Sequence, residues 1–227
     1  MNMNALNTLV KTQAILERAR ISIHNQELHI DSETARARYA ALTRILSDYE
    51  QEWEALMQQE VRSHPAWPWL QTVKGIGQQT AALILSYLLP PLEDKGPSTW
   101  FKAAGLYPVA VGEEMRLPRY DHLNGQRATW HPRLRRNLHI VGTSLMRAKD
   151  FYYQHYLECR AALALKHPDW KGRVHSVAFW KMVKLFLAHL YEVWALEIGV
   201  QPPEPYPIAL LGHKKIRVPH PVGAGIQ

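Results

Sequence analysis

The sequence has a single cysteine, Cys159, and no long uninterrupted apolar segment among its 227 residues. One cysteine excludes a disulfide within the chain and favours a reducing compartment. The most apolar late stretch, residues 177–199, is interrupted by two lysines, a histidine and two glutamates, which argues against a membrane span. The first residues, MNMNALNTLVKTQ, lack the apolar core of a secretory signal. These absences predict a cytoplasmic protein without a membrane partner.

Acidic residues are nearly missing from one part of the chain. Between Arg116 and Lys149 there are eight lysines and arginines but one acid, Asp121. This window carries a charge of +7, as does the whole chain, so the remainder is close to neutral. Concentrated positive charge attracts polyanions such as nucleic acid. A solvated basic face without a ligand is the competing interpretation.

Apolar residues that recur every three or four positions predict a mainly α fold. The helices are expected over residues 5–30, 33–62, 78–89, 98–104, 132–165 and 173–198. The first two predict an antiparallel helical hairpin or coiled-coil arm, with Asp31 or Ser32 as N-cap between them. The arm packs within the chain or forms a homodimer with a second copy. A small β-hairpin is expected around Asn124-Gly125.

These elements divide the chain into three parts. Residues 1–64 form the arm, 65–199 a helix-hairpin-helix domain, and 200–227 a proline-rich tail without periodicity.

The stretch WLQTVKGIGQQTAALILSYL, residues 69–88, fits the helix-hairpin-helix pattern. Its two glycines permit positive φ and a close approach of the backbone to a ligand, while the isoleucine between them inserts into the core. A helix that starts after the second glycine leaves free N–H groups for a phosphate. The predicted contact residues are Lys74, Gly75, Ile76, Gly77, Gln78, Gln79 and Thr80. A glycine turn between packed helices, without a ligand, is the alternative.

The basic window supplies a second set of predicted phosphate contacts. Its members are Arg116, Arg119, Arg127, His131, Arg133, Arg135, Arg136 and His139. Arg133, Arg136 and His139 share a helix face, so they are expected to line a phosphate track, with an exposed helix end as the alternative. Three neighbouring aromatic residues are candidates for stacking on unpaired bases: Trp100, Tyr107 and Trp130. Trp53, Trp180 and Trp194 are expected in the core.

No catalytic residue, metal site or cofactor is predicted. His155 and Cys159 lie one helical turn apart, but His175 is distant, so a tetrahedral zinc site is not completed. Glu113-Glu114 has no third acid nearby for a two-metal nuclease.

Beyond the hairpin, the chain resembles the C-terminal part of the DEDD-type, bridge-RNA-guided insertion-sequence transposases over residues 6–198. Four pieces follow the order of that family: LVKTQAILERARISIHNQ in the arm, VKGIGQQTAALIL, WFKAAGLYP and RATWHPRLRRNLHIVGTSL. The resemblance implies a helical arm followed by a transposase domain that binds nucleic acid.

Two features of that family are not found. Its members place a RuvC-like domain with four catalytic acids before the arm, whereas this sequence begins at the arm. They also use a serine nucleophile after the G-L-x-P segment, and residues 105–129 contain no serine.

The resemblance therefore implies a catalytically inactive relative that binds nucleic acid, DNA above all, at the nucleoid. Branched DNA and structured RNA are alternative ligands, and a recombinase is an expected partner. One alternative function is a split transposase subunit that needs a separate RuvC-like chain. The other is a structural oligomerisation module that binds no nucleic acid.

Overall fold

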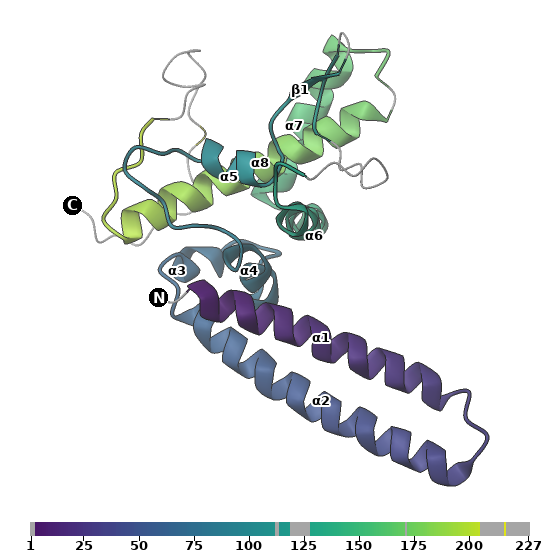
Figure 1. Ribbon diagram of the computed structural model, residues 1–227. Coiled ribbons are helices and arrows are strands. Elements are labelled where there is room, and N and C mark those ends of the chain that lie inside the picture. The colour runs from purple at the N-terminus through teal and green to yellow at the C-terminus, as the bar shows by residue number, and fades with distance from the viewer. Residues whose placement is uncertain (1–2, 112–113, 119–127, 171, 205–215, 217–227) are drawn as a thin grey trace.

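The computed structural model describes residues 3–111, 114–118, 128–170, 172–204 and 216. These residues form eight helices and one two-stranded sheet, so the prediction of a mainly α fold is confirmed (Figure 1). In chain order the elements are α1 (Met3–Glu27), α2 (Glu33–Arg62), α3 (Trp67–Leu70), α4 (Gln78–Leu85), α5 (Ser98–Ala103), β1 (Val109–Val111), β2 (Glu114–Arg116), α6 (Pro132–Ala148), α7 (Phe151–Lys166) and α8 (Arg173–Glu197).

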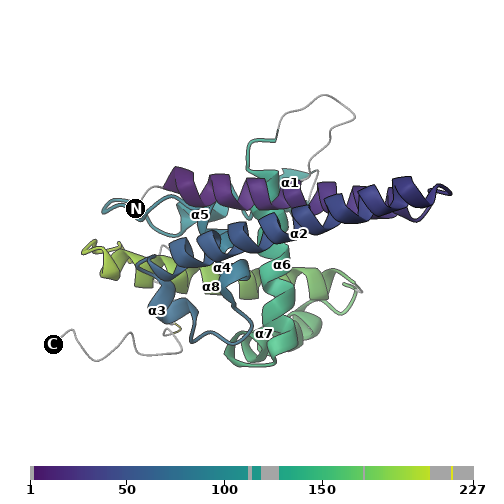
Figure 2. The ribbon, with the colours of Figure 1, turned by 90° about the horizontal axis from the view of Figure 1, so that it is seen from below.

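The two N-terminal helices form the predicted antiparallel arm, which projects from the rest of the molecule (Figures 1 and 2). Ser32 caps α2, because its hydroxyl oxygen accepts a hydrogen bond from the N–H of Ala35 at 3.4 Å. An ion pair of 2.8 Å joins Arg20 of α1 to Glu50 of α2. Apolar residues at the base of the arm, such as Leu6 and Val61, are buried in the core. The arm is therefore anchored at its base.

The last helix, α8, is the centre of the body, which comprises residues 64–200. It is the predicted helix over 173–198, and thirteen of its side chains are buried. Helix α7 packs along it, and α6 crosses it at Gly142. A Cβ at Gly142 would lie 2.4 Å from the Phe179 ring, so glycine permits this crossing.

The prediction of one long helix over residues 132–165 is wrong. It is divided into α6 and α7 at Lys149, which has φ 52° and is the one described non-glycine residue with positive φ. Asp150 then precedes α7 in extended backbone. Neither residue is a glycine or proline, so local sequence carries no strong signal for this break. The reversal lets α7 pack back along α8.

The helix after the glycine turn is shorter than expected, because α4 ends at Leu85 rather than at residue 89. The helix before the turn, α3, spans four residues. The described strands pair Val109 with Arg116, which places the sheet before the expected turn. The residues Asn124-Gly125 lie outside the described residues, as do most of those in the tail. No helix in the described ranges is long and apolar enough to cross a membrane.

Candidate nucleic-acid interface

The glycine turn between α3 and α4 agrees with prediction at two of its three central positions. Gly75 has φ +92°, a value that favours glycine, and Ile76 is buried in the core. Gly77 does not use the positive φ that glycine permits, because its φ is −91° and its ψ is 177°. No atom lies within 4 Å of a Cβ built at Gly77. The backbone therefore requires glycine at Gly75 and not at Gly77.

The close approach at Gly75 is made to helix α6. A Cβ there would lie 2.9 Å from the carbonyl oxygen of Ser144. The Ser144 hydroxyl donates a hydrogen bond of 2.6 Å to the Gly75 carbonyl oxygen. Because Gly75 has no side chain, the turn can pack closely on α6. The sequence predicts that a phosphate would make this close approach instead.

The start of α4 offers free N–H groups at Gln78, Gln79 and Thr80, since no side chain caps them. An acid lies beside them, however. The amide nitrogen of the Gln79 side chain donates a hydrogen bond of 2.6 Å to the Glu54 carboxylate of α2. A carboxylate at a helix N-terminus occupies the favourable field that would otherwise attract a phosphate. The turn by itself is therefore a weak anion site.

Two of the predicted contacts at the start of α6 have partners within the protein. Arg135 donates a hydrogen bond of 2.6 Å to the Pro118 carbonyl oxygen, and its guanidinium lies 5.9 Å and 5.5 Å from the rings of Trp130 and Trp180. Burial lowers the pKa of Arg135. Such contacts attach the segment after β2 to the body. Arg135 thus acts in packing more than in ligand contact.

His131 is the N-cap of α6. Its Nδ1 accepts a hydrogen bond of 3.4 Å from the N–H of Leu134, and its ring packs against Tyr87. Burial, then the positive charges of Arg133 and Lys11, lower the pKa of His131. A neutral ring that caps a helix contributes no positive charge for a phosphate.

Arg133 and Arg136 are exposed on the outer face of α6, as predicted. Arg147, three turns after Arg136, lies on the same face and was not among the predicted contacts. We call these three residues the α6 arginine stripe. None makes a hydrogen bond or ion pair with another described residue, and α6 contains no acid. The stripe extends for about 21 Å at 1.5 Å per residue.

The stripe ends near the glycine turn, since Gly75 contacts Ser144 and Ala148 in the last turns of α6. Lys74, 72% exposed, lies in the same turn, with its ammonium 3.7 Å from the Asp150 carboxylate. Figure 1 shows α6 end-on, between α4 and the α7–α8 pair. In Figure 2 it crosses the direction of the arm. The fold thus brings the two sequence-predicted segments, 74–80 and 133–136, onto neighbouring elements.

The other predicted contacts are scattered. His139 is exposed beside the rings of Phe179 and Trp180. Arg116 is exposed on β2, whereas Arg119 and Arg127 lie outside the described residues.

Of the three aromatic residues predicted to stack on bases, one is buried and two are partly exposed. Trp100 is wrong as a stacking candidate, because it is buried and its indole N–H donates to the Leu89 carbonyl oxygen at 3.0 Å. Tyr107 and Trp130 remain partly exposed. Trp180, expected in the core, is only half-buried, next to Arg135.

The histidine and cysteine side chains of α7 pair without forming a metal site. The Sγ of Cys159 lies 3.4 Å from Nε2 of His155, and burial raises the pKa of the thiol. His175 pairs instead with Tyr156 at 2.8 Å. No group of three or more possible metal ligands occurs in the part of the chain that the structure describes.

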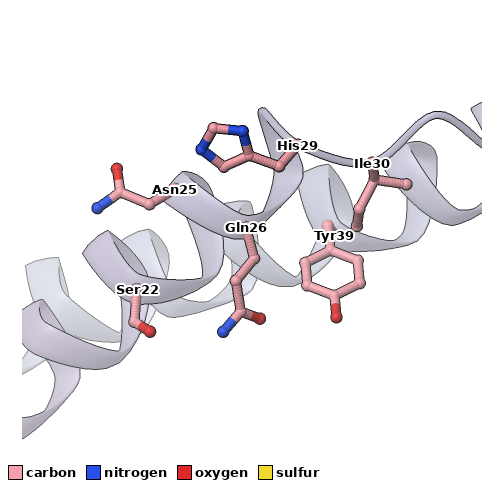
Figure 3. A pocket seen from close by; sticks show the side chains of 6 residues that line it. All are labelled: Ser22, Asn25, Gln26, His29, Ile30 and Tyr39. Atoms are coloured by element: carbon pink, nitrogen blue, oxygen red, sulfur yellow. The ribbon is translucent and has the colours of Figure 1, made fainter.

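A shallow hollow lies near the tip of the arm (Figure 3). It is lined by Ser22, Asn25, Gln26, His29, Ile30 and Tyr39. In Figure 3 the side chains of Asn25 and His29 point away from those of Gln26 and Tyr39, so the polar groups do not converge. The lining contains no lysine or arginine, and it lacks the charge that a phosphate requires.

No protein-family model matches the chain, and no curated protein matches its sequence.

Proposed function

We propose that the protein binds nucleic acid through the sugar–phosphate backbone, without sequence preference, and that DNA is its main ligand. The observation that supports this most is the α6 arginine stripe. Three exposed guanidinium groups lie on one face of a helix without an acid, and none is engaged by another described residue. Free guanidinium groups form charge-assisted hydrogen bonds with phosphate oxygens, and these carry no sequence information.

Lys74 and Lys149 extend the same positive region at the end of α6. Both are exposed, and Lys74 is only weakly held by Asp150 at 3.7 Å. At about 3.4 Å between phosphates of one strand, a stripe of about 21 Å reaches some six nucleotides. The glycine turn therefore acts in this proposal as a support that holds Lys74 beside the stripe.

We infer further that the protein works without catalysis of its own, as an accessory to a recombinase of a mobile element or defence system. The order of the four transposase-like pieces supports this relationship. The lack of serine over residues 105–129 supports the inactive state.

The test is a titration of the full chain with a labelled 30-base-pair duplex of arbitrary sequence, over 50–300 mM salt. The triple variant Arg133→Ala, Arg136→Ala, Arg147→Ala should bind more weakly. Its plot of log affinity against log salt should be less steep by about 3, since each lost phosphate contact removes about 0.9. The same titration with branched DNA, single-stranded DNA and structured RNA tests the expected preference for DNA.

The matched control removes equal charge elsewhere. Arg18→Ala, Arg160→Ala, Lys166→Ala alters three exposed basic residues outside α2 and α6, and it should leave the salt slope unchanged. Equal losses in both variants would show only a net-charge effect and would overturn the assignment of the stripe. No binding by the wild-type chain at 50 mM salt would overturn the function and favour a structural module.

A further inference from the structure

The second helix of the arm carries an apolar stripe that faces solvent. Leu42, Ile45, Tyr49 and Leu56 are 43%, 50%, 51% and 49% exposed. Their spacings of three, four and seven residues place them on one face of α2. On another face of the same helix, Met57 and Val61 are buried in the core. A helix with two apolar faces at heptad spacing is typical of one that packs on both sides.

The stripe is arranged symmetrically about Tyr49. Leu42 precedes it by seven residues and Leu56 follows it by seven. Ile45 precedes it by four, and the partly exposed Trp53 follows it by four. An antiparallel copy of α2, related by a two-fold axis at Tyr49, would therefore place Leu42 of one chain against Leu56 of the other. The same surface is then used by both chains, as a two-fold interface requires.

The distribution of charge along α2 also favours an antiparallel arrangement of two copies of the helix. The half of the helix before Tyr49 has three arginines, Arg36, Arg38 and Arg44, and two acids at its ends. The half from residue 50 has four glutamates and one arginine; Glu50 and Glu54 have partners in α1 and α4, which leaves Glu52 and Glu60 for a second copy. Antiparallel pairing brings the basic half of one helix beside the acidic half of the other. In the register centred on Tyr49, Arg38 faces Glu60 of the second copy. Parallel pairing would place like charges together, which is unfavourable.

From this complementarity of shape and charge, we propose that the solvent-facing stripe of α2 binds a second copy of this chain, antiparallel, to form a two-fold dimer through the arms. The inference is independent of nucleic-acid binding. The arm projects from the body, and α6 is not part of it (Figure 1), so the proposed interface and the α6 arginine stripe lie on different elements. The dimer would present two such stripes.

The first test is sedimentation equilibrium of the full chain, without nucleic acid, from about 1 to 200 μM. We expect a dimer whose fraction rises with concentration. The variant Leu42→Glu, Tyr49→Glu should be monomeric throughout, with an unchanged circular-dichroism spectrum, because both side chains are exposed. The control Leu92→Glu, Leu165→Glu alters two exposed leucines outside the arm and should dimerise as the wild type does.

The second test fixes direction by disulfide trapping in a Cys159→Ser background. A mixture of the Leu42→Cys chain and the Leu56→Cys chain should oxidise to the mixed dimer, while each chain alone should not cross-link. Self-cross-linking of the Leu42→Cys chain would overturn the antiparallel arrangement. A wild-type chain that stays monomeric at 200 μM, or a glutamate variant that still dimerises, would overturn the proposal itself.

Discussion

The arm and the body distribute their apolar side chains differently. In the body, α8 is buried on several faces, and α6 exposes mostly polar residues. In the arm, only the base is buried, and α2 keeps a row of large apolar side chains in contact with water. The body is thus complete as a hydrophobic core, whereas the arm has an apolar face that its own chain leaves uncovered. The features that point to partners are on the surfaces: arginine on α6 and leucine, isoleucine and tyrosine on α2.

The largest expected effect tests this difference directly. Phe186→Ala in α8 empties a fully buried site and should lower the free energy of unfolding by about 3–5 kcal/mol. Leu42→Ala in the arm should change it by no more than about 0.5 kcal/mol at concentrations where the chain is monomeric. Urea denaturation of both variants measures the contrast. Similar losses would show that the arm is as tightly packed as the body.

The junction of arm and body should respond to pH. His64, just after α2, is buried against Trp194, and burial lowers its pKa to about 4. Its Nδ1 accepts a hydrogen bond of 3.1 Å from the N–H of Ala66, which requires the neutral ring.

Between pH 6.5 and 4 the unfolded chain takes up a proton at His64 that the folded chain does not. The free energy of unfolding should therefore decrease as the pH falls through this window, by about 3 kcal/mol from this residue. His64→Gln keeps an acceptor for Ala66 and does not titrate, so its chemical denaturation from pH 4 to 7 gives the baseline. Parallel pH profiles for the two proteins would show that the junction is open to water.

The smallest effect compares the two glycines of the turn. Gly75→Ala forces a side chain into positive φ and within 2.9 Å of the Ser144 carbonyl oxygen, so it should cost about 1–3 kcal/mol. Gly77→Ala has open space and an extended backbone and should change stability by less than about 0.5 kcal/mol. Thermal unfolding distinguishes them. Equal losses would contradict the packing of the turn on α6.

Much of the fold is readable from local pattern. Helix α2 begins and ends where its Ser32 cap and apolar periodicity predict, and α8 does so within a residue. The turn between α6 and α7 was not predictable, because Lys149 adopts positive φ without glycine. In the candidate site, too, some features could be predicted from local sequence and others could not. Arg135 and Arg136 are adjacent and chemically equal in the sequence, yet Arg135 is half-buried near the rings of two tryptophans and Arg136 is exposed.

Residues close together in the chain specified the helical content of this protein, the antiparallel arm and the position of its positive charge, since periodicity, capping and composition act over a few positions. Packing between residues far apart in the chain decided which arginine side chains are exposed to solvent. Trp180 is 45 residues from Arg135, and Ser144 is 69 residues from Gly75. Contacts between such distant residues depend on how the helices cross. These contacts hold Arg135 and Gly75 within the body of the protein. Arg133, Arg136 and Arg147 lie outside them and are exposed to solvent.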